Sequence, residues 1–363
     1  MIDNNPYVAA ADIRVSNQMN NVPAQVLKAP LIVFKENGKS VNFAEWNLHD
    51  VSFVQPARIN AFIVFLSSNG INYVLALAAG TPFHHILKAT EVVSGVVTQQ
   101  IEPKTATSQK LGQVTIGNII LKMNPKLGGY NQYFQQGAPS ALNNQNVDAF
   151  KSFMEVTMVM GFYLSHSAPG NSREGEPSVC GYSFSINNRG NVARGGFIYF
   201  QGRDFEAGNA DEQAPMKHTL TDIELRKPLQ EACTLYFEKN GKYPEYVLVY
   251  RFGTSDGEIE KVKSEESGYM ASILSDAMDG RSPKLIVISV RRQHNTRLFK
   301  QHADINGNDK APLQNVEPGS CVAGTNPADI VMVPHRALQV RNCKPHFCSN
   351  LPSSEDLDVS QDF

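Results

Sequence analysis

The chain contains two short segments whose residue types could bind a phosphate group. In the first, His84 and Lys88 are one helical turn apart, so both side chains can project from the same face of a helix. Gln99 follows further along the chain and adds a side-chain amide. An imidazole, an ammonium group and an amide all donate hydrogen bonds, and the ammonium group also supplies the positive charge that suits a phosphate.

In the second segment, Lys122, Asn124 and Lys126 are spaced by two residues, which places all three side chains on one face if the segment is extended. Gly128 and Gly129 follow and indicate a turn. If the two segments meet, their lysines converge with the imidazole of the first segment, an arrangement suited to a phosphate. Lysines at such spacing also occur as ordinary solvated surface, and the spacing alone leaves this alternative open.

The composition indicates a folded globular protein. The chain has 363 residues, of which 42% are hydrophobic and 19% charged, enough for two domains of ordinary size. The formal net charge is −2, so any affinity for nucleic acid must come from a local cluster of Lys and Arg.

The cysteines indicate reduced thiols, since there are five of them, an odd number, and most are far apart in the sequence. One zinc candidate exists, Cys343 and Cys348 with His346 between them, but it lacks a second ligand pair. We therefore expect no metal and no other cofactor. The first residues do not resemble a signal peptide, and the longest apolar run, residues 61–66, is far shorter than the ~20 residues that a bilayer needs. A cytoplasmic or nuclear protein is expected.

The hydrophobic pattern of the first part alternates between strand and helix, which favours an α/β layer fold. A helix with one buried face is predicted to begin at Thr81, and the Asn- and Gln-rich stretch 130–148 is interpreted as a domain boundary. Strands are predicted at residues 31–34, 61–66, 73–77 and 119–123.

The second part begins with strands and continues with alternating helices and strands, which predicts a mixed sheet. Ser255 and Glu258 have the spacing of a capping box, which starts a helical run to about Met278. After Pro334 the pattern dissolves, and residues 351–363, with four acids and no base, are expected to be a solvated tail. The predicted strands are residues 156–164, 178–186, 196–201, 246–251 and 285–290, and a further helix is predicted at residues 218–239.

Several of these segments resemble the Argonaute family. The run IILKMNPKLGGYN at residues 119–131 is similar to the family pattern N-I-x-L-K-x-N-x-K-L-G-G-x-N of the MID domain, as are AEWNL at residues 44–48 and the run 88–99 that ends in Thr-Gln. YRFGTSDG at residues 250–257 and RQHNTRLF at residues 292–299 resemble Y-R-D-G-V-S-E-G and K-R-H-H-T-R-L-F of the PIWI domain. Residues 318–329 resemble the P-G-T-x-V-D pattern of that domain.

The resemblance covers roughly residues 25 to 335 and implies a fold for each part. It implies a Rossmann-like MID domain over residues 26–140, then an RNase H-like PIWI domain with a mixed sheet over residues 141–335, truncated at its C-terminal end. Residues 1–25 would be an N-terminal extension and residues 336–363 a divergent acidic tail. The amino-terminal and PAZ domains of full Argonautes are not expected.

The resemblance also implies which residues hold RNA. The family's pocket for the 5′ phosphate of a small guide RNA corresponds to His84, Lys88, Gln99 and Lys126, with Lys122 nearby. Where the family commonly has Tyr, this chain has His84, which can also stack on a base and donate to a phosphate. A segment that contacts the guide backbone corresponds to Arg292, His294 and Arg297. A target RNA would be selected by base pairing with the guide, and silencing partner proteins are expected.

The same resemblance implies that the chain does not cleave RNA. An RNase H-like nuclease needs clustered carboxylates that hold two Mg²⁺ ions. Tyr163 stands where the family has the Asp of G-x-D-V-T-H-P, and Phe252 stands where it has the Asp of Y-R-D-G. Asp204 or Glu206 is a weak match to a third carboxylate. No H-x-x-x-Q-G-T segment with the fourth ligand follows His335. We therefore expect no enzyme, as in the nematode-type branch of the family.

The absence of that C-terminal segment also removes a carboxylate and a basic residue that reach the phosphate pocket in relatives. Losing one charge-assisted hydrogen bond to a phosphate costs about 1.5–3 kcal/mol. Two alternatives to a non-cleaving guide binder therefore stay open. One is a degenerate relative that binds no guide and acts as an interaction protein or has no function. The other is an active nuclease with relocated carboxylates. The guide class and the chemistry of its 5′ end are also open.

Overall fold

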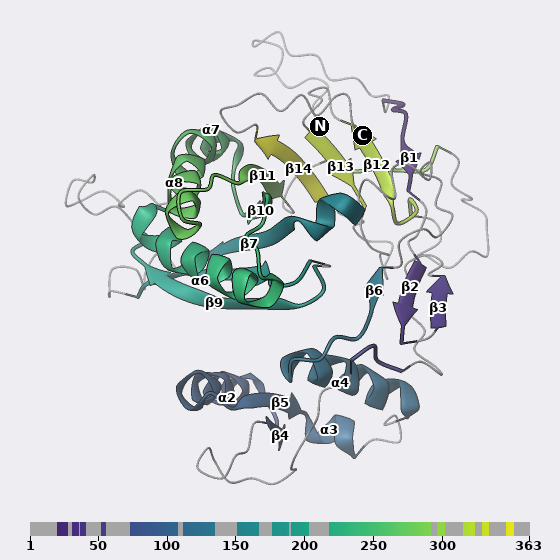
Figure 1. Ribbon diagram of the computed structural model, residues 1–363. Coiled ribbons are helices and arrows are strands. Elements are labelled where there is room, and N and C mark those ends of the chain that lie inside the picture. The colour runs from purple at the N-terminus through teal and green to yellow at the C-terminus, as the bar shows by residue number, and fades with distance from the viewer. Residues whose placement is uncertain are drawn as a thin grey trace, which may run out of the picture.

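The structure is a computed structural model, and it forms a mixed α/β protein whose largest element is a nine-stranded sheet (Figure 1). No helix within the described part of the chain is long and apolar enough to cross a bilayer. The described residues are 20–27, 31–35, 37–40, 52–55, 73–107, 112–134, 151–166, 176–188, 190–202, 218–291, 296–301, 315–323, 329–333 and 346–351.

One half of the nine-stranded sheet combines an antiparallel meander with parallel strands. β7 (Thr157–Ser165), β8 (Ser178–Ser185) and β9 (Ala193–Phe200) form the meander. β10 (Tyr246–Phe252) runs parallel to β7 on one side and to β11 (Lys284–Arg291) on the other. The mixed sheet predicted from the sequence is therefore confirmed.

The other half of the sheet is antiparallel throughout and brings together segments from both ends of the chain. Its strands, in order from β11, are β14 (His346–Leu351), β13 (Asp329–Met332), β12 (Ser320–Ala323) and β1 (Gln25–Val26). β14 was not expected, because the sequence pattern after Pro334 predicts no regular element. It lies between β11 and β13, so long-range strand pairing determines it.

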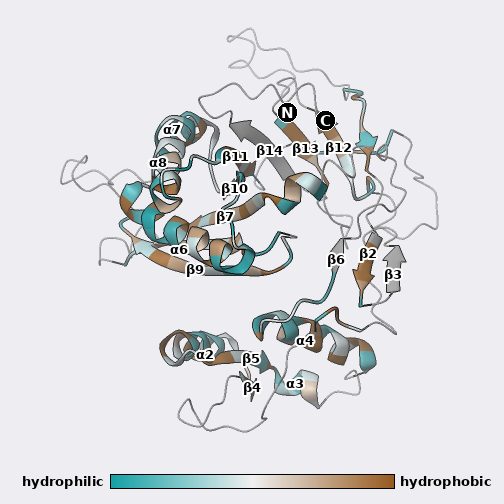
Figure 2. Ribbon diagram, viewed as in Figure 1, coloured by the Kyte–Doolittle hydropathy of each residue, from teal (hydrophilic) through white to brown (hydrophobic). Residues whose placement is uncertain are grey.

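Two helices cover one face of β7 to β11 and close the core. α6 (Asp222–Asn240) packs on α8 (Ser267–Ala277), on β8 and on β9, while α8 also contacts β11. Figure 2 shows apolar residues along β7 and a mixture of polar and apolar residues along α6. The core between these elements contains Phe162, Leu229 and Ile273, each at most 1% exposed. This burial explains why the apolar runs of the strands were predictable from the sequence.

A fully buried ion pair fixes β10 to the helices. Arg251 and Glu266 are both 0% exposed, and Arg251 Nε donates to Glu266 Oε1 at 2.7 Å. Arg251 Nη2 also donates to the carbonyl oxygen of His218 at 2.7 Å, and the backbone N–H of Leu220 donates to Glu266 Oε2 at 3.1 Å. The pair thus joins β10, the π-helical turn η3 (Val262–Glu266) and the segment that leads into α6.

The helix starts follow the expected capping chemistry. At α6, the Thr221 backbone N–H donates to Glu224 Oε2 at 2.7 Å. At η2 (Asp256–Glu258), the Ser255 backbone N–H donates to Glu258 Oε2 at 2.7 Å. The predicted capping box is therefore present, and the helical run continues through α7 (Ile259–Lys261) and η3 to α8.

A smaller unit contains the lysine-bearing segments. Strand β4 (Tyr73–Leu77), helix α2 (Thr81–Ser94) and strand β5 (Val97–Ile101) form a strand–helix–strand crossover with the two strands parallel. Its two described strands form a sheet of their own, as expected for an α/β layer. α3 (Pro103–Ala106) and α4 (Gln113–Lys126) follow, and a separate three-stranded sheet contains β2 (Leu31–Phe34), β3 (Asn37–Ser40) and β6 (Tyr133–Phe134).

The strand predicted at residues 119–123 is wrong, because these residues lie inside helix α4. Only the two isoleucines of Ile-Ile-Leu-Lys-Met favour a strand, whereas Leu, Lys and Met are strong helix formers, and the helix buries Met123 and Asn124 on one side. The strand predicted at residues 61–66 lies outside the described residues, as does most of the proposed boundary 130–148.

Breaking the buried ion pair should strongly destabilise the fold. We expect Glu266→Gln to lower the free energy of unfolding by about 3–5 kcal/mol, because it leaves the Arg251 guanidinium buried without its carboxylate. Urea denaturation followed by circular dichroism measures this loss. Glu265→Gln, which removes the same charge from an exposed neighbour on η3, is the matched control and should change stability little. Equal effects of the two substitutions would contradict the role of the pair.

Candidate anion-binding site

Helix α2 directs three side chains of the site toward β5. It begins after Gly80 with Pro82 in its first turn, and it ends at Gly95, whose φ of 67° is left-handed. His84, Lys88 and Glu91 recur at helical spacing, so they share the side of α2 that packs on the neighbouring strand. The predicted helical relation between His84 and Lys88 is confirmed.

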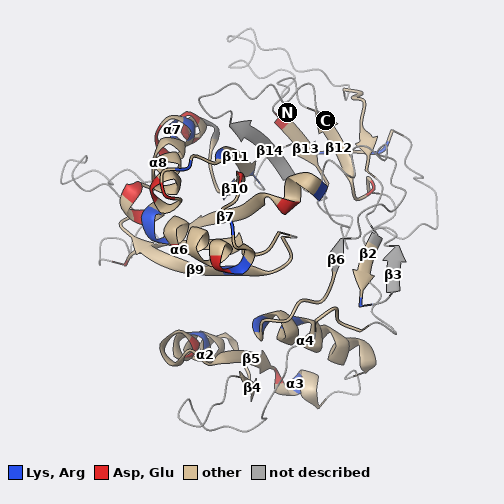
Figure 3. Cartoon of the chain, viewed as in Figure 1, with Lys and Arg blue, Asp and Glu red and all other residues tan. Residues whose placement is uncertain are grey.

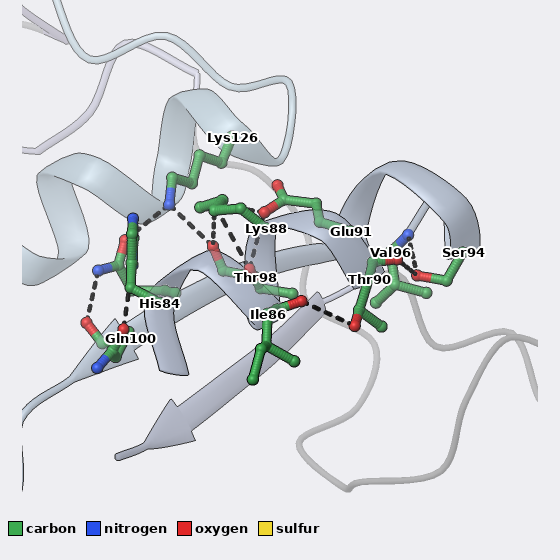
Figure 4. Close-up of polar contacts among 11 residues, drawn as sticks. His84, Ile86, Lys88, Thr90, Glu91, Ser94, Val96, Thr98, Gln100 and Lys126 are labelled. Carbon is green, nitrogen blue, oxygen red and sulfur yellow. Dashed lines mark hydrogen bonds and ion pairs between the residues drawn. The ribbon is translucent and has the colours of Figure 1, made fainter. Parts of the chain in front are cut away.

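The ammonium groups of Lys88 and Lys126 converge on one main-chain oxygen (Figure 4). Lys126 Nζ donates to the carbonyl oxygen of Thr98 at 2.8 Å, and Lys88 Nζ lies 3.5 Å from the same oxygen. Lys126 Nζ also donates to Gln99 Oε1 at 2.9 Å. The structure therefore brings together three of the residues predicted from the sequence, Lys88, Gln99 and Lys126.

The convergence of the lysines has an electrostatic cost. The pKa of Lys126 is lowered by burial and, next, by the positive charge of Lys88, while Lys122 lowers it further. Lys122 lies one helical turn before Lys126 on α4, and Lys122 is exposed. Figure 3 shows blue basic residues, which are both lysines in α4, at the end of this helix that lies toward α2. Like charges held this close favour the binding of an anion among them.

One carboxylate lies inside this cluster of lysines. Glu91 Oε2 forms a short contact with Lys88 Nζ and accepts a hydrogen bond from Thr98 Oγ1 at 2.8 Å. Burial of Glu91 raises the pKa of its carboxyl, but hydrogen bonds from Lys88 and Thr98 outweigh burial and the pKa is lowered overall. Neither Glu91 nor the Thr98 carbonyl oxygen is among the site groups predicted from the sequence. The spacing of three residues between Lys88 and Glu91 was the available signal for the first.

His84, and not His85, contacts the strand beside the lysines. His84 Nδ1 lies 3.0 Å from Gln100 Oε1, and Gln100 Nε2 donates to the carbonyl oxygen of Ala78 at 2.8 Å. Gln100 therefore fixes the His84 ring next to the lysines. The rings of His84 and His85 have centroids 6.5 Å apart. Gln100 is a further site residue that was not predicted from the sequence.

Asn124 is a structural residue, which corrects the expectation that it shares a face with Lys122 and Lys126. Because α4 is helical, only the two lysines share a side, and Asn124 is 5% exposed. Its Nδ2 donates to the Asn131 Oδ1 at 2.9 Å and to the carbonyl oxygen of Gln55 at 3.2 Å. These bonds fix the end of the helix that carries Lys126.

Gly128 and Gly129, which follow α4, also help to fix the end of this helix. Gly128 has φ of 86°, which an L side chain rarely adopts. A Cβ atom on Gly129 would lie 2.2 Å from Asn124 Oδ1 and 2.6 Å from the carbonyl oxygen of Gln55. The turn and the close approach therefore both require glycine, which explains the residue types that follow Lys126.

The residues expected to contact an RNA backbone are only partly described. Arg292 and His294 lie outside the described residues, as do Asp204 and Glu206. Arg297 is half-buried, and its Nη1 donates to the carbonyl oxygen of Thr296 at 2.8 Å.

Tyr163 and Phe252 are direct neighbours in the sheet. They pair in the parallel register of β7 and β10, near the ends of both strands, and Tyr163 is 56% exposed. A phenol and a phenyl ring do not fit as ligands of Mg²⁺, which prefers carboxylate and water oxygens. Among the described residues there is no group of three or more His, Cys, Asp or Glu that could hold a metal ion.

Histidine and hydroxyl groups lie beyond the end of β7. His166 Nδ1 lies 3.1 Å from Ser178 Oγ, and the rings of His166 and His218 have centroids 5.2 Å apart. His218 Nε2 lies 3.2 Å from Glu258 Oε1. Ser178 is 1% exposed, so its hydroxyl serves the packing of this corner and is not accessible to a ligand.

Sequence comparison identifies curated relatives of the chain. Residues 71–338 match the Piwi domain family. The chain is 29% identical over 272 residues to the Nuclear RNAi defective-3 protein of Caenorhabditis elegans, covering 70% of this chain and 24% of that protein. It is 30% identical over 280 residues to Protein argonaute-2 of Drosophila melanogaster, covering 76% of this chain and 20% of that protein. The chain thus spans between a fifth and a quarter of the length of these relatives.

Solved structures show the same fold. The Kluyveromyces polysporus Argonaute crystallised with a guide RNA superposes with a TM-score of 0.71 at 15% identity, over 95% of this chain and 46% of that one. The C-terminal lobe of a budding yeast Argonaute superposes with a TM-score of 0.69 at 14% identity, over 92% of this chain and 80% of that one. The family match and these folds together show that the chain belongs to the Argonaute family and contains its Piwi domain, an RNase H-like fold.

Proposed function

We propose that the lysine cluster of Lys88, Lys122 and Lys126, with His84 and Gln99, binds the 5′-phosphate end of a small guide RNA. The observation that carries this proposal is the approach of Lys88 and Lys126 to the single carbonyl oxygen of Thr98. Of the described residues, only Glu91 brings a carboxylate into contact with these ammonium groups. A phosphate group, with about two negative charges at neutral pH, would balance the positive charge of the cluster and accept further hydrogen bonds from its lysines.

The proposed role in the cell is RNA silencing, with the guide selecting the target by base pairing. The protein would fix the position of the guide through phosphate contacts, which carry no sequence information. Arg292, His294 and Arg297 would extend these contacts along the guide backbone. The one support for this part is membership of the Argonaute family together with the basic residue types at these positions. Silencing partner proteins and a cytoplasmic or nuclear location belong to the same proposal.

We further propose that the chain does not cleave the target RNA. Two adjacent strand ends carry Tyr163 and Phe252, whose rings supply no carboxylate to bind Mg²⁺. Without two bound metal ions, this fold has no means to activate water and to stabilise the leaving oxygen. Silencing would then depend on the bound guide and on partner proteins.

Loss of a pocket lysine should weaken binding of the phosphorylated end specifically. We expect Lys126→Ala to reduce affinity for a 5′-phosphorylated RNA about tenfold to a hundredfold, equivalent to a charged hydrogen bond of about 1.5–3 kcal/mol. Fluorescence anisotropy over a series of salt concentrations measures both the affinity and the salt dependence, which should become weaker. An RNA with a 5′ hydroxyl should show little change.

The matched control is Lys104→Ala, which removes a lysine of α3 that pairs with Glu102. It should leave the preference for the 5′ phosphate unchanged. If the unaltered protein does not prefer the phosphorylated RNA, or if Lys126→Ala and Lys104→Ala behave alike, the pocket of the unaltered protein does not bind guide ends. The chain would then be a relative that keeps the fold and binds no guide.

The proposed lack of cleavage predicts no product under conditions that activate a nuclease. We expect no cleavage of a labelled RNA complementary to the loaded guide in the presence of Mg²⁺ or Mn²⁺, because Tyr163 and Phe252 supply no metal ligands. Gel analysis of the labelled target measures this directly. Cleavage that depends on the metal and is lost on substitution of Asp204 and Glu206 would show instead that the carboxylates lie elsewhere.

A further inference from the structure

We propose that Glu91 is a tethered anion that competes with the guide 5′ phosphate for Lys88 and thereby limits the affinity of the pocket. The inference rests on the proposed function, since it concerns the same lysine cluster. It differs from that function in naming a residue of this chain that opposes guide binding. The observations that carry it are the contacts of Lys88, the charge of Glu91 and the difference between Lys88 and Lys126.

The ammonium group of Lys88 already contacts acceptors inside the protein, and its closest contact is with Glu91. An ammonium group has three N–H donors. Lys88 Nζ contacts Glu91 Oε2 and lies 3.4 Å from Thr98 Oγ1 and 3.5 Å from the Thr98 carbonyl oxygen. The two distances to Thr98 are long for hydrogen bonds, so a phosphate that binds Lys88 competes chiefly with Glu91.

Lys126 differs from Lys88 in this respect. Within the described residues its Nζ has two acceptors, the Thr98 carbonyl oxygen at 2.8 Å and Gln99 Oε1 at 2.9 Å, and neither carries a charge. Lys126 can thus offer a donor to a phosphate while keeping both contacts. Among the described residues, the acceptor that resembles the ligand, an anionic oxygen, lies at Lys88 and not at Lys126.

Glu91 is held in place as an anion. Its Oε2 accepts from Thr98 Oγ1 at 2.8 Å in addition to its contact with Lys88, and both bonds favour the ionised carboxylate. The lowered pKa of Glu91 agrees with this, because Lys88 and Thr98 outweigh the opposing effect of burial. Its side chain is 24% exposed, so it is held by the cluster and is not a freely solvated group.

Glu91 has two opposite effects on the affinity for a phosphate, and the larger effect decides whether Glu91 strengthens or weakens binding. It helps to orient Lys88, which reduces the side-chain entropy lost on binding. It also repels a phosphate bound to the same ammonium group, at a separation of a few ångströms where like charges interact strongly. The orienting effect survives without Glu91, because both Thr98 oxygens still lie near Lys88. Repulsion therefore dominates, and removal of the charge should strengthen binding.

The test compares Glu91→Gln with the unaltered protein. Glutamine keeps the size of the side chain and an oxygen that accepts from Thr98 Oγ1, and it removes the charge. We expect about tenfold tighter binding of a fluorescent single-stranded RNA with a 5′ monophosphate, and no change for the same RNA with a 5′ hydroxyl. Tenfold corresponds to about 1.4 kcal/mol.

The matched control is Glu102→Gln, which removes the same charge from a residue that pairs with Lys104 on α3. It should change the affinity for the phosphorylated RNA less than twofold, which separates a local effect from the change in net charge. Thermal melting of all three proteins establishes that they are folded.

The outcomes separate this inference from the proposed function. If the unaltered protein prefers the phosphorylated RNA and Glu91→Gln binds it equally or more weakly, the pocket stands and the inference is overturned. If the unaltered protein shows no preference and Glu91→Gln acquires one, the inference is supported, because the carboxylate then masks the pocket. If neither protein shows a preference, both proposals fail. A gain shared equally by Glu102→Gln also overturns the inference.

Discussion

The ion pair between Arg251 and Glu266 is the interaction on which the arrangement of the nine-stranded sheet and its covering helices depends. Neither side chain is accessible to solvent, and together they connect a central strand, a π-helical turn and the chain that enters α6. A buried pair of this kind costs desolvation that only good geometry and further hydrogen bonds offset. Here the backbone groups of His218, Leu220 and Phe252 supply those bonds. The end of β10 is thereby fixed, and with it the position of Phe252 beside Tyr163.

Most strands and helices of the nine-stranded sheet and its covering layer were predictable, because burial leaves a periodic pattern in the sequence. Strands β7, β10 and β11 are apolar runs, and α6 and η2 begin at recognisable capping residues. Two segments show where such patterns fail. Residues 119–123 begin with two β-branched isoleucines but lie in a helix, and β14 forms because β11 and β13 flank it. In both cases packing with distant residues decides the structure.

The residue types of the site could be predicted from the sequence, but the hydrogen bonds that connect them could not. His84, Lys88, Gln99 and Lys126 carry donors and charge that a sequence displays, and the structure brings them around β5. The group that organises the lysines is the main-chain carbonyl oxygen of Thr98, which every residue type would supply equally. No pattern of side chains can reveal it. Asn124 shows the converse, because its polar side chain suggests a ligand contact but is used to lock the end of α4.

The lysine cluster and the end of β7 differ in how their charge is balanced. Adjacent carboxylates at the ends of β7 and β10 would repel each other without bound cations, whereas Tyr163 and Phe252 need no counterion. The lysine cluster instead keeps its like charges at short range, and the pKa of Lys126 is lowered as a result of burial and of Lys88. Glu91 compensates part of this charge from within the chain. The remaining positive charge is the physical reason for the proposal that an anion binds between α2 and α4.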